Sequence, residues 1–118
     1  MRLTIGIVLA LVLTVASSLA DPASVYRVSG TNPGSGSTYS GTVTVERNGD
    51  TFLVRWTIAG SRQIGVGIGK DDFLAVSYRS GDSIGIALYR PDQNGGWKGV
   101  WAPMGSEALG TETWIRGR

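Results

Sequence analysis

Apolar residues recur at every second position through most of the chain after residue 20. The clearest runs are Phe52-Val54-Trp56-Ile58, Ile64-Val66-Ile68, Leu74-Val76-Tyr78 and Ile84-Ile86-Leu88. Successive side chains of a strand point to opposite faces, so this period predicts strands with one apolar face. No stretch shows the 3.6-residue period of an amphipathic helix. The chain is therefore expected to be all-β.

Turn signals separate these runs at intervals of about ten residues, a spacing typical of antiparallel sheets. We expect eight strands, at 24–30, 38–46, 51–59, 63–69, 73–79, 83–90, 97–102 and 107–115. Eight short antiparallel strands close most readily into a small up-and-down β-barrel of the calycin or lipocalin kind, because closure removes the exposed edges. A two-sheet β-sandwich is the alternative.

The turns also predict which residues share a face, since directly opposed residues of an antiparallel pair point the same way. Asn48-Gly49 is a strong signal for a two-residue type I′ turn. Three-residue connections centred on Ser61, Asp71 and Gly81 would then place nearly every large apolar side chain on one face. That face would hold Trp56 among Val54, Val66 and Val76.

The segment Gly65-Val66-Gly67-Ile68-Gly69-Lys70 superficially resembles a phosphate-binding loop. A dinucleotide fingerprint starting at Gly65 needs glycine where Lys70 stands, and a Walker loop needs a hydroxyl where Asp71 stands. Both motifs also lead into a helix, whereas a strand is expected here. The segment is therefore not expected to bind phosphate.

In the expected register the three glycines lie on the outside of the barrel, beside other small residues. This arrangement predicts a smooth docking surface for a protein partner or a second copy of the chain. The predicted surface consists of Leu53, Gly65, Gly67, Gly69, Phe73, Ala75 and Tyr89. The alternative interpretation is that the glycines only allow a tight barrel to coil.

The composition excludes several kinds of chemistry. The chain contains neither Cys nor His, so it has no thiolate nucleophile, no imidazole base and no soft zinc ligands. Turn aspartates would gather at one end of the barrel, where calcium is the one ion they could suit: Asp50, Asp71, Asp72 and Asp92. Aspartate is common in turns for backbone reasons alone. We therefore expect no enzyme activity, no catalytic residue, no metal and no cofactor.

Residues 1–20 have the pattern of a secretory signal peptide. Arg2 is followed by an almost wholly apolar run, Leu3–Val15, and Ser18-Leu19-Ala20 has small residues where a signal peptidase cleaves. As a helix, the apolar run would span only about 20 Å, short of a hydrocarbon core of roughly 30 Å. We expect cleavage before Asp21, export to the periplasm or the exterior, and a single domain over 21–118 without a membrane span.

Removal of Arg2 with that segment lowers the formal net charge from +2 to +1. Such a balance, without a basic stripe, argues against nucleic acid as a partner.

The chain after residue 20 resembles small exported proteins of alphaproteobacteria, many of them rhizobial, that are often labelled fibronectin-binding or uncharacterised. The resemblance rests on Tyr26-Arg27-Val28-Ser29-Gly30-Thr31-Asn32-Pro33, Tyr39-Ser40-Gly41-Thr42, Val54-Arg55-Trp56, Gly81-Asp82-Ser83-Ile84-Gly85, Gly99-Val100-Trp101 and Leu109-Gly110-Thr111-Glu112. It implies extracellular binding. It also implies that a disulfide between adjacent strands, near Phe52 and at Gly67, has been lost here.

Two functions of different kinds follow from these patterns. The first is a non-enzymatic interaction protein that uses its outer face. The alternative is a lipocalin- or avidin-like carrier that holds a small apolar ligand inside the barrel, against Tyr39, Trp56, Tyr78, Trp97 and Trp101. An internal cavity of about 300 Å³ or more would favour the carrier.

Overall fold

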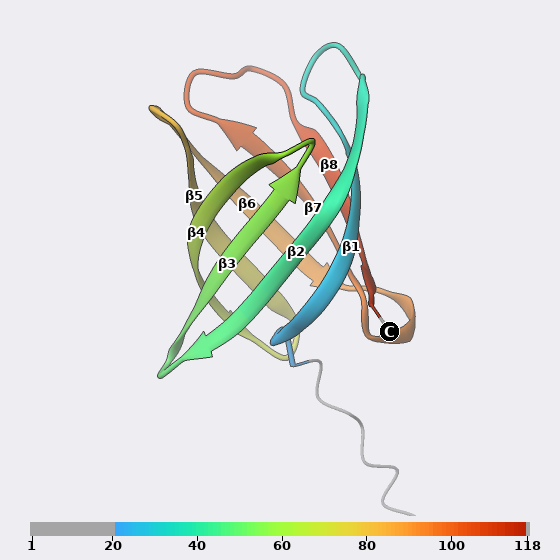
Figure 1. The fold of residues 1–118 in the computed structure, drawn as a ribbon, viewed down its shortest axis with the longest axis vertical. Helices are drawn as coiled ribbons and strands as arrows, with labels where there is room; N and C mark the ends of the chain where they lie inside the picture. Colours follow the sequence, from blue (N-terminus) through green and yellow to red (C-terminus); the bar gives the residue numbers. More distant parts are fainter. Residues whose placement is uncertain (1–20, 118) are drawn as a thin grey trace, which may run out of the picture.

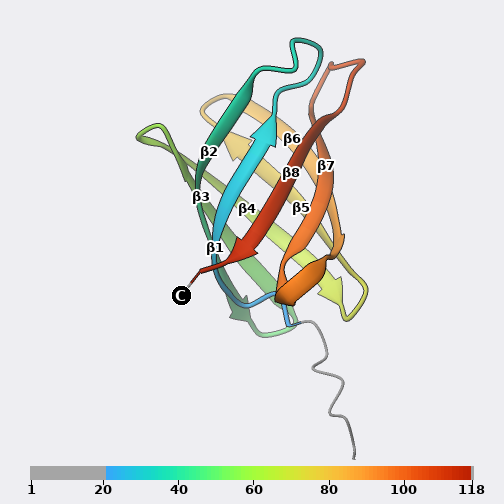
Figure 2. The same ribbon diagram turned by 90° about the vertical axis from the view of Figure 1, so that its right-hand side faces the viewer.

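The computed structural model describes residues 21–117, which form a closed antiparallel barrel (Figures 1 and 2). Its strands are β1 (Ser24–Thr31), β2 (Thr38–Asn48), β3 (Thr51–Ile58), β4 (Ser61–Lys70), β5 (Phe73–Ser80), β6 (Ser83–Pro91), β7 (Trp97–Pro103) and β8 (Gly110–Arg116). Each strand pairs with the next along the chain, and β8 pairs with β1 to close the barrel. A single 3-10 turn, Gln93–Gly95, lies between β6 and β7.

The predicted eight-stranded up-and-down barrel is therefore confirmed, and the sandwich alternative is wrong. The expected signal peptide, residues 1–20, lies outside the described residues. Within residues 21–117, no helix is long and apolar enough to cross a membrane.

The turn between β2 and β3 differs slightly from the expected one. Asn48 pairs with Thr51, so the turn residues are Gly49 and Asp50, and Gly49 has a φ of 60°. Val45 consequently lies opposite Val54. A shift of two residues leaves every side chain on its expected face, because the strand period is two.

The next three turns differ from the expected ones in length, and this changes which face of a strand points into the barrel. Ile58 pairs with Ser61, Lys70 with Phe73, and Ser80 with Ser83. Each connection thus has two residues where three were expected. A change of one residue moves a whole strand to the opposite face, so the expected orientation is wrong for β4 and again for β6.

Side-chain exposure shows the same inversion. Val66 and Ile86, expected in the core, are 56% and 69% exposed, whereas Gly65 and Gly67 are buried. Phe52 and Gly67 lie directly opposite each other in the β3–β4 ladder. The expected burial of Trp56 is confirmed at 4% exposure.

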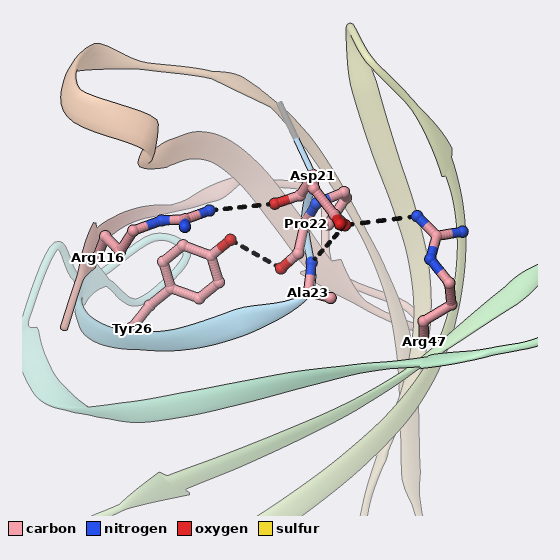
Figure 3. A network of polar contacts seen from close by, with 6 residues as sticks. All are labelled: Asp21, Pro22, Ala23, Tyr26, Arg47 and Arg116. Carbon is pink, nitrogen blue, oxygen red and sulfur yellow. Dashed lines mark hydrogen bonds and ion pairs between the residues drawn. The ribbon is translucent and has the colours of Figure 1, made fainter. Parts of the chain in front are cut away.

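The core fills the half of the barrel near the start of β1. It consists of Tyr26, Val28, Val43, Val45, Phe52, Val54, Trp56, Leu74, Val76, Ala87, Tyr89, Trp97 and Trp114. Segment 21–23 is tied down at this end (Figure 3). The Tyr26 hydroxyl donates to the Pro22 carbonyl at 2.7 Å, Arg116 donates to the Asp21 carbonyl at 3.2 Å, and Arg47 pairs with the Asp21 carboxylate at 3.4 Å.

The inverted register predicts opposite outcomes for two neighbouring substitutions. Val66→Arg should lower the free energy of unfolding by no more than about 1 kcal/mol, because the side chain stays in water. Gly67→Arg should lower it by about 3 kcal/mol or more, because it places an unpaired charge in the barrel interior. Urea unfolding of both variants measures the difference. A Gly67→Arg protein as stable as Val66→Arg would show that the glycines face outward after all.

Candidate functional site

The other half of the barrel interior contains a pocket of about 260 Å³. Its floor lies next to the filled core. Its walls are formed at the end of the barrel that carries the β1–β2, β3–β4, β5–β6 and β7–β8 connections. The lining residues are Asn32, Tyr39, Trp56, Ile58, Gln63, Tyr78, Ser80, Ala87, Tyr89, Trp101 and Glu112.

Glycines directly opposite aromatic residues shape the pocket wall. Tyr39 lies opposite Gly30 in β1–β2, and Tyr78 lies opposite Gly85 in β5–β6. A Cβ atom on either glycine would overlap the hydroxyl and ring of its tyrosine. Absence of a side chain therefore lets each ring lie across the neighbouring strand. The same pairing recurs for Tyr89–Gly99 and Trp101–Gly110.

Four aromatic rings form a continuous series along the pocket. Tyr39 and Trp101 have ring centroids 6.1 Å apart at 76°, and Trp101 and Tyr78 have centroids 6.1 Å apart at 75°. Tyr78 and Trp56 follow at 6.0 Å and 68°. These edge-to-face contacts are favourable and hold the four rings in fixed relative orientations.

A buried glutamate lies at the floor of the pocket. Glu112 of β8 is 6% exposed, and its carboxylate accepts four hydrogen bonds. Oε1 accepts from the Trp114 indole at 2.7 Å, the Tyr89 hydroxyl at 2.8 Å and the Trp56 indole at 3.1 Å. Oε2 accepts from the Tyr39 hydroxyl at 2.5 Å. Four converging donors are the arrangement that an acceptor-only, ionised carboxylate requires.

No cation faces this carboxylate among residues 21–117. The pocket lining contains neither Lys nor Arg, and the two ion pairs in this part of the chain are Arg47–Asp21 and Arg55–Glu46, both exposed. The negative charge of Glu112 is therefore balanced by neutral dipoles alone.

The tyrosines around Glu112 are held in their protonated form. Burial, followed by the negative charge of Glu112, raises the pKa of Tyr39 and of Tyr89 well above the ordinary 10.0. The same two causes raise the pKa of Tyr78. The Tyr39 and Tyr89 hydroxyls therefore remain hydrogen-bond donors to Glu112 at neutral pH.

Four of the five predicted ligand-binding aromatics line the pocket: Tyr39, Trp56, Tyr78 and Trp101. The fifth, Trp97, does not reach it. Trp97 is fully buried opposite Trp114, deeper in the filled core. The prediction was wrong for Trp97 because the shared face runs the full length of the barrel, and the pocket occupies only one end.

The predicted docking surface is not assembled on the outside. Gly65 and Gly67 face the interior, and Tyr89 is 1% exposed and bound to Glu112. The two-residue turns before β4 and β6 are the physical reason, since they invert both strands. The surface prediction is therefore wrong for these three residues.

The remaining members of that set are separated from one another. Leu53, Phe73 and Ala75 are half-buried, and Gly69 lines a second pocket, of about 380 Å³, at the opposite end of the barrel. The turn aspartates do lie in connections at one end of the barrel, but the described part of the chain has no group of three or more acidic side chains placed to hold a metal ion.

The sequence predictions did not include Glu112, and they assigned Tyr89 to the outer surface instead of the pocket. The signal for Glu112 was its spacing, since it lies two residues before Trp114 in a strand and therefore shares the face of that tryptophan. An acidic residue on an apolar face indicates a buried, hydrogen-bonded carboxylate.

Comparisons with known proteins support the fold alone. No protein-family model matches this chain, and no curated protein is found to be similar to it. A solved structure of a redesigned beta barrel, b11L5F_LGL, is similar with a TM-score of 0.72 and 19% sequence identity, over 86% of this chain and 94% of that one. At 19% sequence identity, the similarity shows a shared barrel architecture alone.

The raised tyrosine pKa values predict how stability depends on pH. Below about pH 10 these tyrosines are protonated in both the folded and the unfolded chain, so they cause no pH dependence. Above it, the unfolded chain releases protons that the folded protein retains, and stability falls by up to about 1.4 kcal/mol per pH unit for each such tyrosine.

Urea unfolding at several pH values between about 8 and 11 measures this slope. Tyr89→Phe should make the fall above about pH 10 shallower, because it removes one of the coupled tyrosines. An unchanged slope in the Tyr89→Phe variant would contradict the raised pKa assigned to Tyr89.

Proposed function

We propose that this protein is a non-enzymatic carrier that binds a small ligand inside the barrel. The pocket, at about 260 Å³, is smaller than the roughly 300 Å³ expected of a carrier, so the support comes from its lining: aromatic walls with a single buried carboxylate at the floor. Ligand sites are usually concave and mostly apolar, with a few fixed polar groups that orient the ligand. The pocket combines these features at one end of the barrel, next to the filled core.

The two halves of the barrel interior have different roles: the filled half stabilises the fold, and the pocket half is available to bind a ligand. The filled half contains the fully buried side chains, including Trp97, Trp114 and Leu74. The residues nearest the mouth, such as Tyr39 and Trp101, are only half-buried. A ligand would therefore cover apolar surface that the fold itself leaves accessible, which favours binding. We further propose, from the pattern of residues 1–20, that the carrier acts outside the cytoplasm.

Blocking the pocket tests this function. Ser80→Trp should abolish ligand binding, because Ser80 lines the pocket and a bulky ring there would fill it. Ser77→Trp is the matched control, since Ser77 is exposed on the outer face of the same strand. Isothermal titration calorimetry with choline and with 3,3-dimethyl-1-butanol measures binding.

At least one probe should bind the wild type and the control with a stoichiometry of one. Binding that survives Ser80→Trp, or no binding of either probe to the wild type, would contradict the carrier function.

The outer surface favours a second role, self-association. Large apolar side chains cover the outside of β4, β6 and β7 instead of the polar residues usual there: Ile64, Val66, Ile68, Ile84, Ile86, Leu88 and Val100, which are 39–69% exposed. The register makes one apolar row continuous from β4 to β7, through Ile68, Ala75, Leu88 and Val100. Nearer the pocket end, Ser77 and Arg79 of β5 lie between the apolar side chains of β4 and β6. Contiguous exposed apolar surface is typical of an interface.

We propose a second copy of the chain as the partner, because an isologous contact between identical faces is the commonest kind in homodimers. Both ends of the face carry charges of both signs: Arg62, Arg79 and Asp82 at the pocket end, and Lys70, Asp71, Asp72, Arg90 and Lys98 at the opposite end.

Ile86→Lys should convert such a dimer to a monomer, because it places a charge at the centre of the apolar face. Thr42→Lys, on the exposed face of β2, is the control and should leave the dimer intact. Sedimentation velocity measures the mass of each species. A wild type that is monomeric at micromolar concentration would overturn this second role.

A further inference from the structure

We propose that the ligand of the barrel pocket is a small organic cation, carrying a quaternary ammonium or protonated amine group. The inference rests on the proposed carrier function and specifies the chemical class of its ligand. It draws on the charge of the pocket, the nature of its walls and its size.

The charge of the pocket favours a cation. Glu112 lines the pocket, and no Lys or Arg of residues 21–117 lines it with this carboxylate. Oε1 already accepts three hydrogen bonds, but Oε2 accepts only one and so retains capacity for a further donor. Because charges interact more strongly at low dielectric than in water, a cation in the pocket would supply the missing counter-charge.

The walls favour the same class of ligand. Trp56, Trp101, Tyr39 and Tyr78 line the pocket, and their edge-to-face contacts hold the rings in place. The faces of aromatic rings carry partial negative charge and attract cations within about 6 Å, with Trp the most effective. Quaternary ammonium groups are commonly bound by such aromatic cages.

Two further lining groups have oxygen atoms without partners: the Gln63 amide oxygen is an acceptor, and the Tyr78 hydroxyl can accept as well as donate. The Gln63 amide oxygen and the Tyr78 hydroxyl are buried and form no hydrogen bond within the described part of the chain. A protonated amine has donors for such oxygens. An anion would instead meet the charge of Glu112 and the negative ring faces, so the pocket disfavours it.

The size of the pocket limits the cation. At about 260 Å³ it is smaller than the cavities of about 300–1,000 Å³ that hold drug-sized ligands. A compact head group with a short substituent fits this space better than a long-chain or polycyclic amine.

A matched pair of probes tests the inference. Choline and 3,3-dimethyl-1-butanol have the same shape and differ in that nitrogen replaces the quaternary carbon, which gives choline its positive charge. Isothermal titration calorimetry on the wild type should show choline bound at least about tenfold more tightly than its neutral analogue, which corresponds to about 1.4 kcal/mol.

Two variants identify the source of this preference. Glu112→Gln preserves an amide oxygen for the three donors at Oε1 and removes the charge, so the preference for choline should fall to about twofold or less. Trp101→Leu, a change at the half-buried end of the pocket, should weaken choline binding more than binding of the neutral analogue. It keeps the test decisive if Glu112→Gln does not fold.

The outcomes separate the two proposals. Equal or tighter binding of 3,3-dimethyl-1-butanol, sensitive to Ser80→Trp, would overturn the cation inference and leave the carrier function standing. A choline preference that is unchanged in both Glu112→Gln and Trp101→Leu would also overturn the inference. Failure of both probes to bind would overturn the two proposals together.

Discussion

The Glu112 carboxylate is the constraint on which the interior of this barrel depends. Its four donors come from β2, β3, β6 and β8, so one side chain connects strands from all around the barrel. A carboxylate with 6% exposure is tolerated only when its hydrogen-bonding capacity is largely satisfied. Tyr39, Trp56, Tyr89 and Trp114 must therefore hold their present positions together. The same network forms the boundary between the filled core and the pocket.

Glycine is the second requirement, because bulky rings in a narrow barrel need space on the adjacent strand. Gly65 shows this most clearly. It lies opposite Tyr78, and a Cβ there would come within 2.7 Å of Val76 Cγ1 and 3.2 Å of Trp56 Cζ3. Gly65 thus makes room for Trp56, which belongs to both the network and the pocket, whereas Gly67 and Gly69 make room for Leu74 of the core. The alternation Gly65-Val66-Gly67-Ile68-Gly69 has a packing role inside the barrel.

The sequence contained enough information for the architecture but not for the orientation of every strand. Period-two alternation and regular turns predicted eight antiparallel strands and a closed barrel, and both are confirmed. The error arose from assuming that Val66 and Ile86 face the core because they are large and apolar. Ala59 and Gly60, with φ of 50° and 76°, form a two-residue turn instead, and this turn geometry determines the face of β4. Glu112 escaped prediction because an isolated glutamate is ordinarily exposed.

The free energy of unfolding of Glu112→Ala tests the central role of this carboxylate most directly. Removing the acceptor leaves buried hydroxyl and indole donors unpaired, so stability should fall by about 3 kcal/mol or more, while Glu107→Ala in an exposed loop should change it by no more than about 0.5 kcal/mol. Tyr89→Phe should then cost less in the Glu112→Ala background than in the wild type, because its partner has already been removed. A Glu112→Ala protein as stable as Glu107→Ala would contradict the account.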